Sequence, residues 1–222
     1  MKRLVAGLLA ATMVFGAFAL DISVGGDLDF THQWNTTKTK DKDGKKTKDV
    51  TSQNLFGINV FGDFQYVIVG FGGDFSVGAE KSTYIDEDGK KTSITDSKVS
   101  MQYFNMRLLG KYPFNVGIAK LYPMAGFQFS FNTAKKYDGK DMKKDMSSED
   151  KADLNKYYFV LGFGADIFAT DNVFIRVTPM FGFQLNKPHD YKDTKDFYSK
   201  FDTKYSNIGY MFNLGIGAGY KF

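Results

Sequence analysis

Residues 21–34 read DISVGGDLDFTHQW, a stretch in which two kinds of residue alternate. Ile22, Val24, Leu28 and Phe30 would share one face of an extended chain, and polar residues would occupy most of the other. This period of two is typical of a half-buried β-strand. Seven later stretches repeat it, which predicts eight strands in all: about 56–64, 67–77, 104–108, 121–131, 157–167, 173–185 and 205–222.

The connections between these stretches alternate in length. Short links are expected near 62–65, 111–116 and 169–172, and long polar segments at 35–52, 82–98, 134–156 and 187–204. Polar loops of this length are uncommon in compact domains. If long and short connections strictly alternate, all the long loops leave the same rim of the sheet. The sequence therefore predicts an all-β, eight-stranded, antiparallel up-and-down transmembrane barrel with long extracellular loops and short periplasmic turns.

The apolar face of the strands is expected to point outward. It carries about forty large side chains, whereas an eight-stranded barrel has room inside only for a filling of side chains or one small ligand. A soluble barrel with this face inside is excluded on volume. The outward face would therefore lie in lipid, and the polar face would line the lumen.

Composition narrows the function classes further. The chain has 222 residues, 23 Phe, 13 Tyr, 23 Gly and no Cys, with a formal net charge of +4. Loss of Lys2 and Arg3 would lower that charge from +4 to +2, so no strong basic stripe for nucleic acid is expected. Without Cys there is neither a disulfide nor a thiolate metal site. We expect no cofactor and no metal.

The first residues have the features of an export signal. Met1-Lys2-Arg3 is followed by an uncharged run from Leu4 to Leu20, and Ala17-Phe18-Ala19 fits a small-x-small cleavage pattern. We interpret residues 1–19 as a cleaved secretory signal peptide and residues 20–222 as the barrel. An uncleaved membrane anchor is the alternative, because the run approaches the ~20 residues that span a bilayer.

The C-terminal stretch NLGIGAGYKF, residues 213–222, alternates apolar residues to its last position. In this and in its strand pattern the chain resembles the small eight-stranded outer-membrane barrels, the group that includes OmpX, Ail and the membrane domain of OmpA. The resemblance implies an outer-membrane location, contact with outer-membrane lipid, and a last strand read by the barrel-assembly machinery. The residues that would form this signal are Leu214, Ile216, Ala218, Tyr220 and Phe222.

Charged residues of both signs are expected inside the barrel. Desolvated charges require partners, so a network of ion pairs that fills the lumen is one interpretation and a charged constriction in a narrow pore is the other. Lumen glycines, among them Gly164 and Gly219, leave space that Tyr122 and Phe174 could fill. The expected lumen charges are Asp27, Asp29, Asp74 and Glu80 (the latter two on the third strand), Arg107, Asp166 and Arg176.

The long loops are rich in lysine and share a turn motif. Asp-Gly between strand-like residues is a hairpin signal, so the first two hairpins are expected to continue beyond the membrane as ribbons. The third loop also contains SSEDKADLNK, which could form a short helix capped by Ser147. The expected turn residues are Asp43 and Gly44, Asp88 and Gly89, and Asp138 and Gly139.

No catalytic constellation is visible, and we expect no enzyme. His32 falls in the lipid-facing register beside Trp34, and His189 lies in a loop. The favoured hypothesis is a closed barrel that anchors surface loops for envelope stability or for adhesion to an anionic glycolipid or a host or matrix polymer. The alternative is a narrow porin-like channel for small or apolar solutes.

Overall fold

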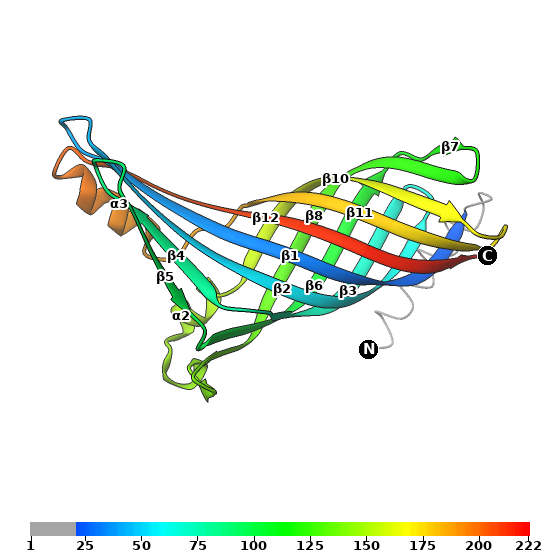
Figure 1. Ribbon diagram of the computed structural model, residues 1–222, viewed down its shortest axis with the longest axis horizontal. Coiled ribbons are helices and arrows are strands. Elements are labelled where there is room, and N and C mark those ends of the chain that lie inside the picture. The colour runs from blue at the N-terminus through cyan, green and yellow to red at the C-terminus, as the bar shows by residue number, and fades with distance from the viewer. Residues whose placement is uncertain (1–20) are drawn as a thin grey trace, which may run out of the picture.

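The computed structural model describes residues 21–222, and the expected signal peptide lies outside them. Eight long strands form a closed antiparallel ring, because β1 pairs with β2 on one side and with β12 on the other (Figure 1). The ring confirms the predicted fold class. Its strands, in ring order, are β1 (Ile22–Lys40), β12 (Lys204–Lys221), β11 (Val173–Gln184), β10 (Lys156–Phe168), β8 (Ala119–Tyr137), β6 (Val99–Lys111), β3 (Val67–Ser76) and β2 (Lys46–Phe64).

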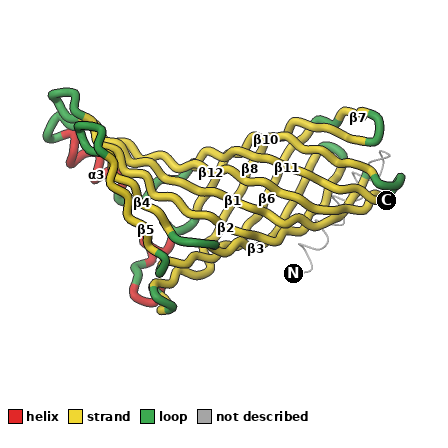
Figure 2. Tube along the Cα trace, viewed as in Figure 1, coloured by secondary structure: helices red, strands yellow, loops and turns green. Residues whose placement is uncertain are grey.

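Shorter elements extend the ring at its ends. The β4–β5 hairpin continues the sheet beside β2, and β1 and β2 stay paired out to Lys40 and Lys46, so both predicted ribbons are present (Figure 2). Among the described residues, no helix is long and apolar enough to cross a membrane. These elements are β4 (Glu80–Ile85), β5 (Lys91–Asp96), β7 (Phe114–Val116), β9 (Lys140–Asp141), η1 (Lys143–Asp145), α2 (Ser148–Asp153) and α3 (Tyr191–Ser199).

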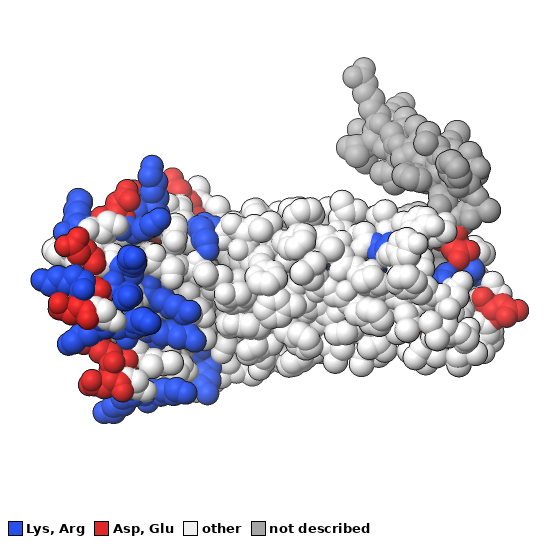
Figure 3. Space-filling model, turned by 90° about the horizontal axis from the view of Figure 1, so that it is seen from above, with Lys and Arg blue, Asp and Glu red and all other residues white. Residues whose placement is uncertain are grey.

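The outer surface of the barrel is apolar around its middle. Figure 3 shows a broad band free of Lys, Arg, Asp and Glu, bounded by the crowded charges of the loops at one end and sparse charges at the other. Leu28, Ile58 and Ile216 are among the exposed side chains of this band. Near the loops, Trp34 stacks on Tyr210 and lies 5.3 Å from the ring of His32, as expected of an interfacial aromatic girdle. The apolar face therefore points outward, as predicted.

The lumen is more apolar than the strand pattern indicates. Polar residues alternate inward, but a buried cluster that includes Ile68, Leu109 and Met180 also lies inside the ring. The large side chains fit because glycines face them. A Cβ on Gly219 would lie 2.3 Å from the ring of Phe174, and one on Gly25 would lie 2.4 Å from Phe61. Large and small residues thus alternate across the narrow interior.

Candidate functional site

The half of the lumen nearer the short turns is built around Arg176. Its Nε donates a hydrogen bond of 2.7 Å to Asp166 Oδ1, and its Nη2 donates to Asp166 Oδ2 at 2.7 Å and also to Asp63. Lys111 Nζ donates to the same Asp63 carboxylate at 2.5 Å. All four side chains are buried. Two cations and two carboxylates therefore neutralise one another across the barrel, as desolvated charges require.

Aromatic rings enclose this cluster. The Arg176 guanidinium lies 4.1 Å from the ring centroid of Phe61 and 5.2 Å from that of Phe174. Lys111 Nζ lies 4.4 Å from the ring of Tyr122, whose hydroxyl donates to Asp166 at 2.9 Å. Cation–π contacts of this kind contribute most where water is excluded. The rings both fill the cross-section and hold the charged groups in position.

A second network lies further toward the loops. Arg107 donates to Asp29 Oδ2 at 2.6 Å and to Gln128 Oε1 at 2.9 Å. Asp27 and Asp74 are also buried, but neither makes an ion pair within the described residues. Each occupies the space over a glycine: a Cβ on Gly217 would lie 2.2 Å from Asp27 Oδ1, and one on Gly57 would lie 2.0 Å from Asp74 Oδ1. These carboxylates, like the aromatic rings, therefore pack against glycines of the barrel wall, where a larger residue would leave them no space.

The structure places six of the seven expected lumen charges inside the ring: Asp27, Asp29, Asp74, Arg107, Asp166 and Arg176. Glu80 is different. It was expected on the third strand, but β3 ends at Ser76, and the chain turns at Gly78, whose φ is +79°, before Glu80 begins β4. A positive φ favours glycine and interrupts the strand. Glu80 therefore lies at the start of the β4–β5 ribbon, outside the third strand of the ring.

Two central members of the network, Asp63 and Lys111, are missing from the sequence-based set. Both had been assigned to short links, at 62–65 and 111–116, but β2 runs to Phe64 and β6 to Lys111. A signal was present: Asp63 continues the inward register of Asn59 and Phe61. The predicted link 62–65 overlaps the predicted strand 56–64 at Asp63, and the predicted strand 104–108 ends three residues before Lys111.

Open space is small at the level of the two charged networks. An internal cavity lined by Asp27, Arg107 and Arg176, among others, has a volume of about 20 Å³, which is close to the size of one water molecule. Side chains, rather than a continuous passage, occupy this level of the lumen.

A larger groove, of about 560 Å³, lies among the ribbons of the long loops. It is formed by the ends of β1, β2 and β12 and by the β4–β5 turn. Asp86 and Glu87 also line it, but Asp86 Oδ1 accepts from the backbone of its own turn and Glu87 pairs with Lys45 at 2.8 Å. The lysines that line the groove are Lys38, Lys40, Lys46, Lys48 and Lys204.

These lysines face one another across the strands. Lys38 lies opposite Lys48, and Lys40 lies between Lys46 on one neighbouring strand and Lys204 on the other. Within the described part of the chain, none of the five forms an ion pair. Like charges directly opposite one another destabilise a sheet. The groove is therefore lined by five lysines without an ion-pair partner and by two acidic residues, of which Glu87 is already paired with Lys45.

The three Asp-Gly motifs lie at the turns of the loop hairpins, where the sequence predicted them. In the first two, the backbone N–H of Gly44 donates to Asp41 and that of Gly89 to Asp86, and the glycines have φ of +83° and +79°. Asp43 and Asp88 precede these glycines within the turns. At the third, Asp138 and Gly139 both have positive φ, 51° and 77°, between β8 and β9. Asp-Gly thus reverses the chain at all three positions.

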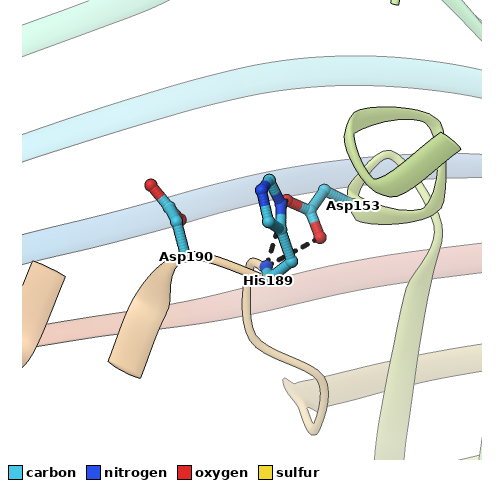
Figure 4. Close-up of side chains that lie close together, drawn as sticks. All are labelled: Asp153, His189 and Asp190. Atoms are coloured by element: carbon cyan, nitrogen blue, oxygen red, sulfur yellow. Dashed lines mark hydrogen bonds and ion pairs between the residues drawn. The ribbon is translucent and has the colours of Figure 1, made fainter. Parts of the chain in front are cut away.

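The third and fourth loops meet at the end of α2. Helix α2 is capped by Ser147, whose Oγ accepts from the backbone of Asp150 at 3.0 Å, as its sequence predicted. At its other end, Asp153 Oδ2 lies 2.7 Å from His189 Nδ1, with Asp190 beyond the imidazole (Figure 4). The hydrogen bond to Asp153 raises the pKa of His189 above its ordinary value.

The C-terminal strand closes the ring at the rim that carries the short turns. The backbone N–H of Phe222 donates to Ile22 O at 2.9 Å, and the rings of Tyr220 and Phe222 lie 5.3 Å apart. Their side chains face outward with those of Ile216 and Ala218, and Leu214 is half-buried in the same register.

No protein-family model matches the chain, and no curated protein matches it in sequence. Solved structures of similar fold include the outer membrane protease OmpT from Escherichia coli (12% identity, 94% of this chain and 100% of that chain, TM-score 0.44). Neisserial surface protein A has 12% identity over 88% and 97% of the two chains, with a TM-score of 0.41. Ail, the attachment invasion locus protein of Yersinia pestis, has 14% identity over 89% and 99%, with a TM-score of 0.38. At these identities the likeness extends to the fold alone.

Proposed function

We propose that this protein is a non-conducting outer-membrane barrel that anchors a basic extracellular groove, and that the groove binds an anionic polymer or glycolipid. The ligand chemistry is a closely spaced series of sulfate, phosphate or carboxylate groups. Two sources provide it: a soluble acidic polysaccharide, or the phosphorylated headgroups of surface glycolipid.

The opposed lysine pairs carry this proposal. Lys38 faces Lys48, and Lys40 is flanked by Lys46 and Lys204, with no acid paired to any of the five within the described residues. Such an arrangement costs free energy in the isolated protein. A polyanion lying along the groove would offset that cost by contacting several lysines at once.

Protection of a sheet edge is the ordinary explanation for lysines on strands. It does not account for Lys38 and Lys40, because β1 is hydrogen-bonded on both sides along its whole length. The filled lumen supports the anchoring role over the channel alternative, since the internal cavity holds about 20 Å³.

Binding of the refolded barrel to a sulfated polysaccharide, and separately to vesicles with and without lipopolysaccharide, tests the proposal. Replacing all five groove lysines with glutamine should weaken binding at least tenfold. Added salt should weaken wild-type binding steeply, because exposed charges are screened. The vesicle and polysaccharide arms distinguish a glycolipid from a soluble polymer.

A matched control replaces five lysines of the third loop: Lys136, Lys140, Lys143, Lys144 and Lys151. This variant has the same net charge as the groove variant but leaves the groove intact, so it should bind nearly as wild type does. Equal losses in both variants would show that total charge, rather than the groove, governs binding. Unchanged binding in the groove variant would overturn the proposal.

A further inference from the structure

We propose that Asp153, His189 and Asp190 form a binding site for a divalent transition-metal ion, of which zinc is the representative, between the third and fourth extracellular loops. The site does not depend on the basic groove or its ligand. It joins residues 36 positions apart in the sequence, which is why inspection of local spacing did not reveal it.

The three side chains already lie within coordinating reach of one another. One ligand atom from each can be chosen so that all three lie within 4.8 Å of each other. Ligand atoms ~2.1 Å from a tetrahedral zinc ion lie ~3.4 Å apart. The Asp153–His189 pair, at 2.7 Å, would therefore open slightly and Asp190 would move closer. Both changes would require rotation of the half-buried Asp153 and of the exposed His189 and Asp190 side chains.

The backbone holds two of the ligands in place before an ion arrives. The N–H of His189 donates to both carboxylate oxygens of Asp153, at 2.9 and 3.1 Å. These bonds fix the end of α2 against the start of the fourth loop's helix. Figure 4 shows the imidazole of His189 between the side chains of Asp153 and Asp190.

The third carboxylate is available as well. Asp190 occupies the N-cap position of α3, where an aspartate usually accepts a hydrogen bond from the first helical N–H groups. Its side chain makes no such bond, and its contact with Thr194 Oγ1 is long, at 3.5 Å. The carboxylate of Asp190 therefore does not cap α3, and it lies beside the imidazole of His189, where it could bind a metal ion.

The donor set selects the class of ion. One imidazole nitrogen with two carboxylate oxygens suits zinc and neighbouring transition metals, whereas magnesium and calcium prefer oxygen ligands alone. Three protein ligands leave a fourth position open to water or to an external group. Bound metal would strengthen the link between the two loops that the Asp153–His189 hydrogen bonds already make.

Titration of the refolded barrel, without an affinity tag, with Zn²⁺ and with Co²⁺ tests the site. The expected result is one ion per chain by calorimetry and a visible absorption band for Co²⁺. His189→Ala should abolish saturable binding. Asp190→Asn, which leaves the Asp153–His189 pair intact, should weaken binding at least tenfold. Asp138→Asn, an exposed carboxylate elsewhere in the loops, should bind as wild type does.

A second readout concerns the loops themselves. Metal should slow amide exchange in residues 147–155 and 187–199, and a chelator should reverse the effect. The proposal is overturned if wild type shows no one-to-one binding, or if Asp190→Asn or His189→Ala binds as wild type does. Binding without any change in exchange would also contradict a link between the loops.

Discussion

Gly164 lies directly against the ring of Tyr122: a Cβ built on Gly164 would lie 2.0 Å from Cε2 of that ring. The ring cannot easily move away, because its hydroxyl donates to Asp166 and its face contacts Lys111. Because Gly164 on β10 has no side chain, the ring of Tyr122 on β8 fits against it. The ring helps to close the half of the lumen nearer the short turns.

Substitution of Gly164 by alanine should destabilise the barrel. The added methyl group overpacks a filled interior, which costs about 1–3 kcal/mol. Urea unfolding in lipid vesicles, followed by the gel mobility of the folded form, measures the effect. Gly110→Ala is the matched control, because its Cβ would meet its nearest atom at an ordinary 3.7 Å. Equal stability of the two variants would mean that the Tyr122 ring can move enough to accommodate the added methyl group.

Arg176→Met should be among the most damaging single substitutions. It leaves Asp63 and Asp166 buried with one cation fewer, and removal of one partner from a buried ion pair costs about 3–5 kcal/mol. Adding Asp166→Asn should recover part of the loss, since it removes one of the uncompensated charges. Lys45→Gln, which breaks the exposed pair with Glu87, should not measurably shift the urea midpoint. A small effect of Arg176→Met would contradict the proposed neutralisation.

Gly89→Val should loosen the second ribbon without affecting the barrel. Gly89 has a φ of +79°, a conformation that costs an L-residue with a side chain roughly 1–2 kcal/mol. Amide exchange should become faster across the β4–β5 pair, for example at Tyr84 and Thr92, while β12 stays protected. Unchanged exchange in the ribbon would show that the turn does not hold the hairpin together.

Phe222→Ala should impair assembly in cells more than folding in the test tube. Phe222 is highly exposed at the rim and contributes one backbone hydrogen bond to ring closure, which alanine retains. If the last strand is read by the assembly machinery, outer-membrane levels should fall severalfold while spontaneous folding into vesicles is nearly unchanged. Phe183→Ala, a lipid-facing control on β11, should behave alike in both assays.

The sequence allowed the ring itself to be predicted, because a period of two and alternating loop lengths are local signals. The outward direction of Leu28 or Ile216 followed from volume alone. Strand ends were less predictable. Lys111 lies three residues beyond the predicted strand 104–108, and no local signal showed that this strand continues. Asp63 lies where the predicted strand 56–64 overlaps the predicted link 62–65, and only its inward register indicated that it belongs to the lumen.

Contacts between distant segments were beyond the reach of local pattern. The pairing of Asp63 with both Arg176 and Lys111 depends on the order of strands across the lumen. The approach of Asp153 to His189 depends on how the third and fourth loops pack together. The lysine pairs of the groove were only partly predictable. A two-residue turn at Asp43-Gly44 would place Lys40 opposite Thr47. The hairpin instead pairs Lys40 with Lys46, because the turn contains three residues, 42–44.

Single-channel recording of the refolded barrel in a planar bilayer tests the filled lumen most directly. Protein shown to be folded should give no steady openings, whereas a Phe61→Ala, Tyr122→Ala, Phe174→Ala triple variant, which removes the rings around Arg176, should conduct. Steady openings of the wild type, altered by Arg107 or Arg176 substitutions, would instead establish a pore through the charged network.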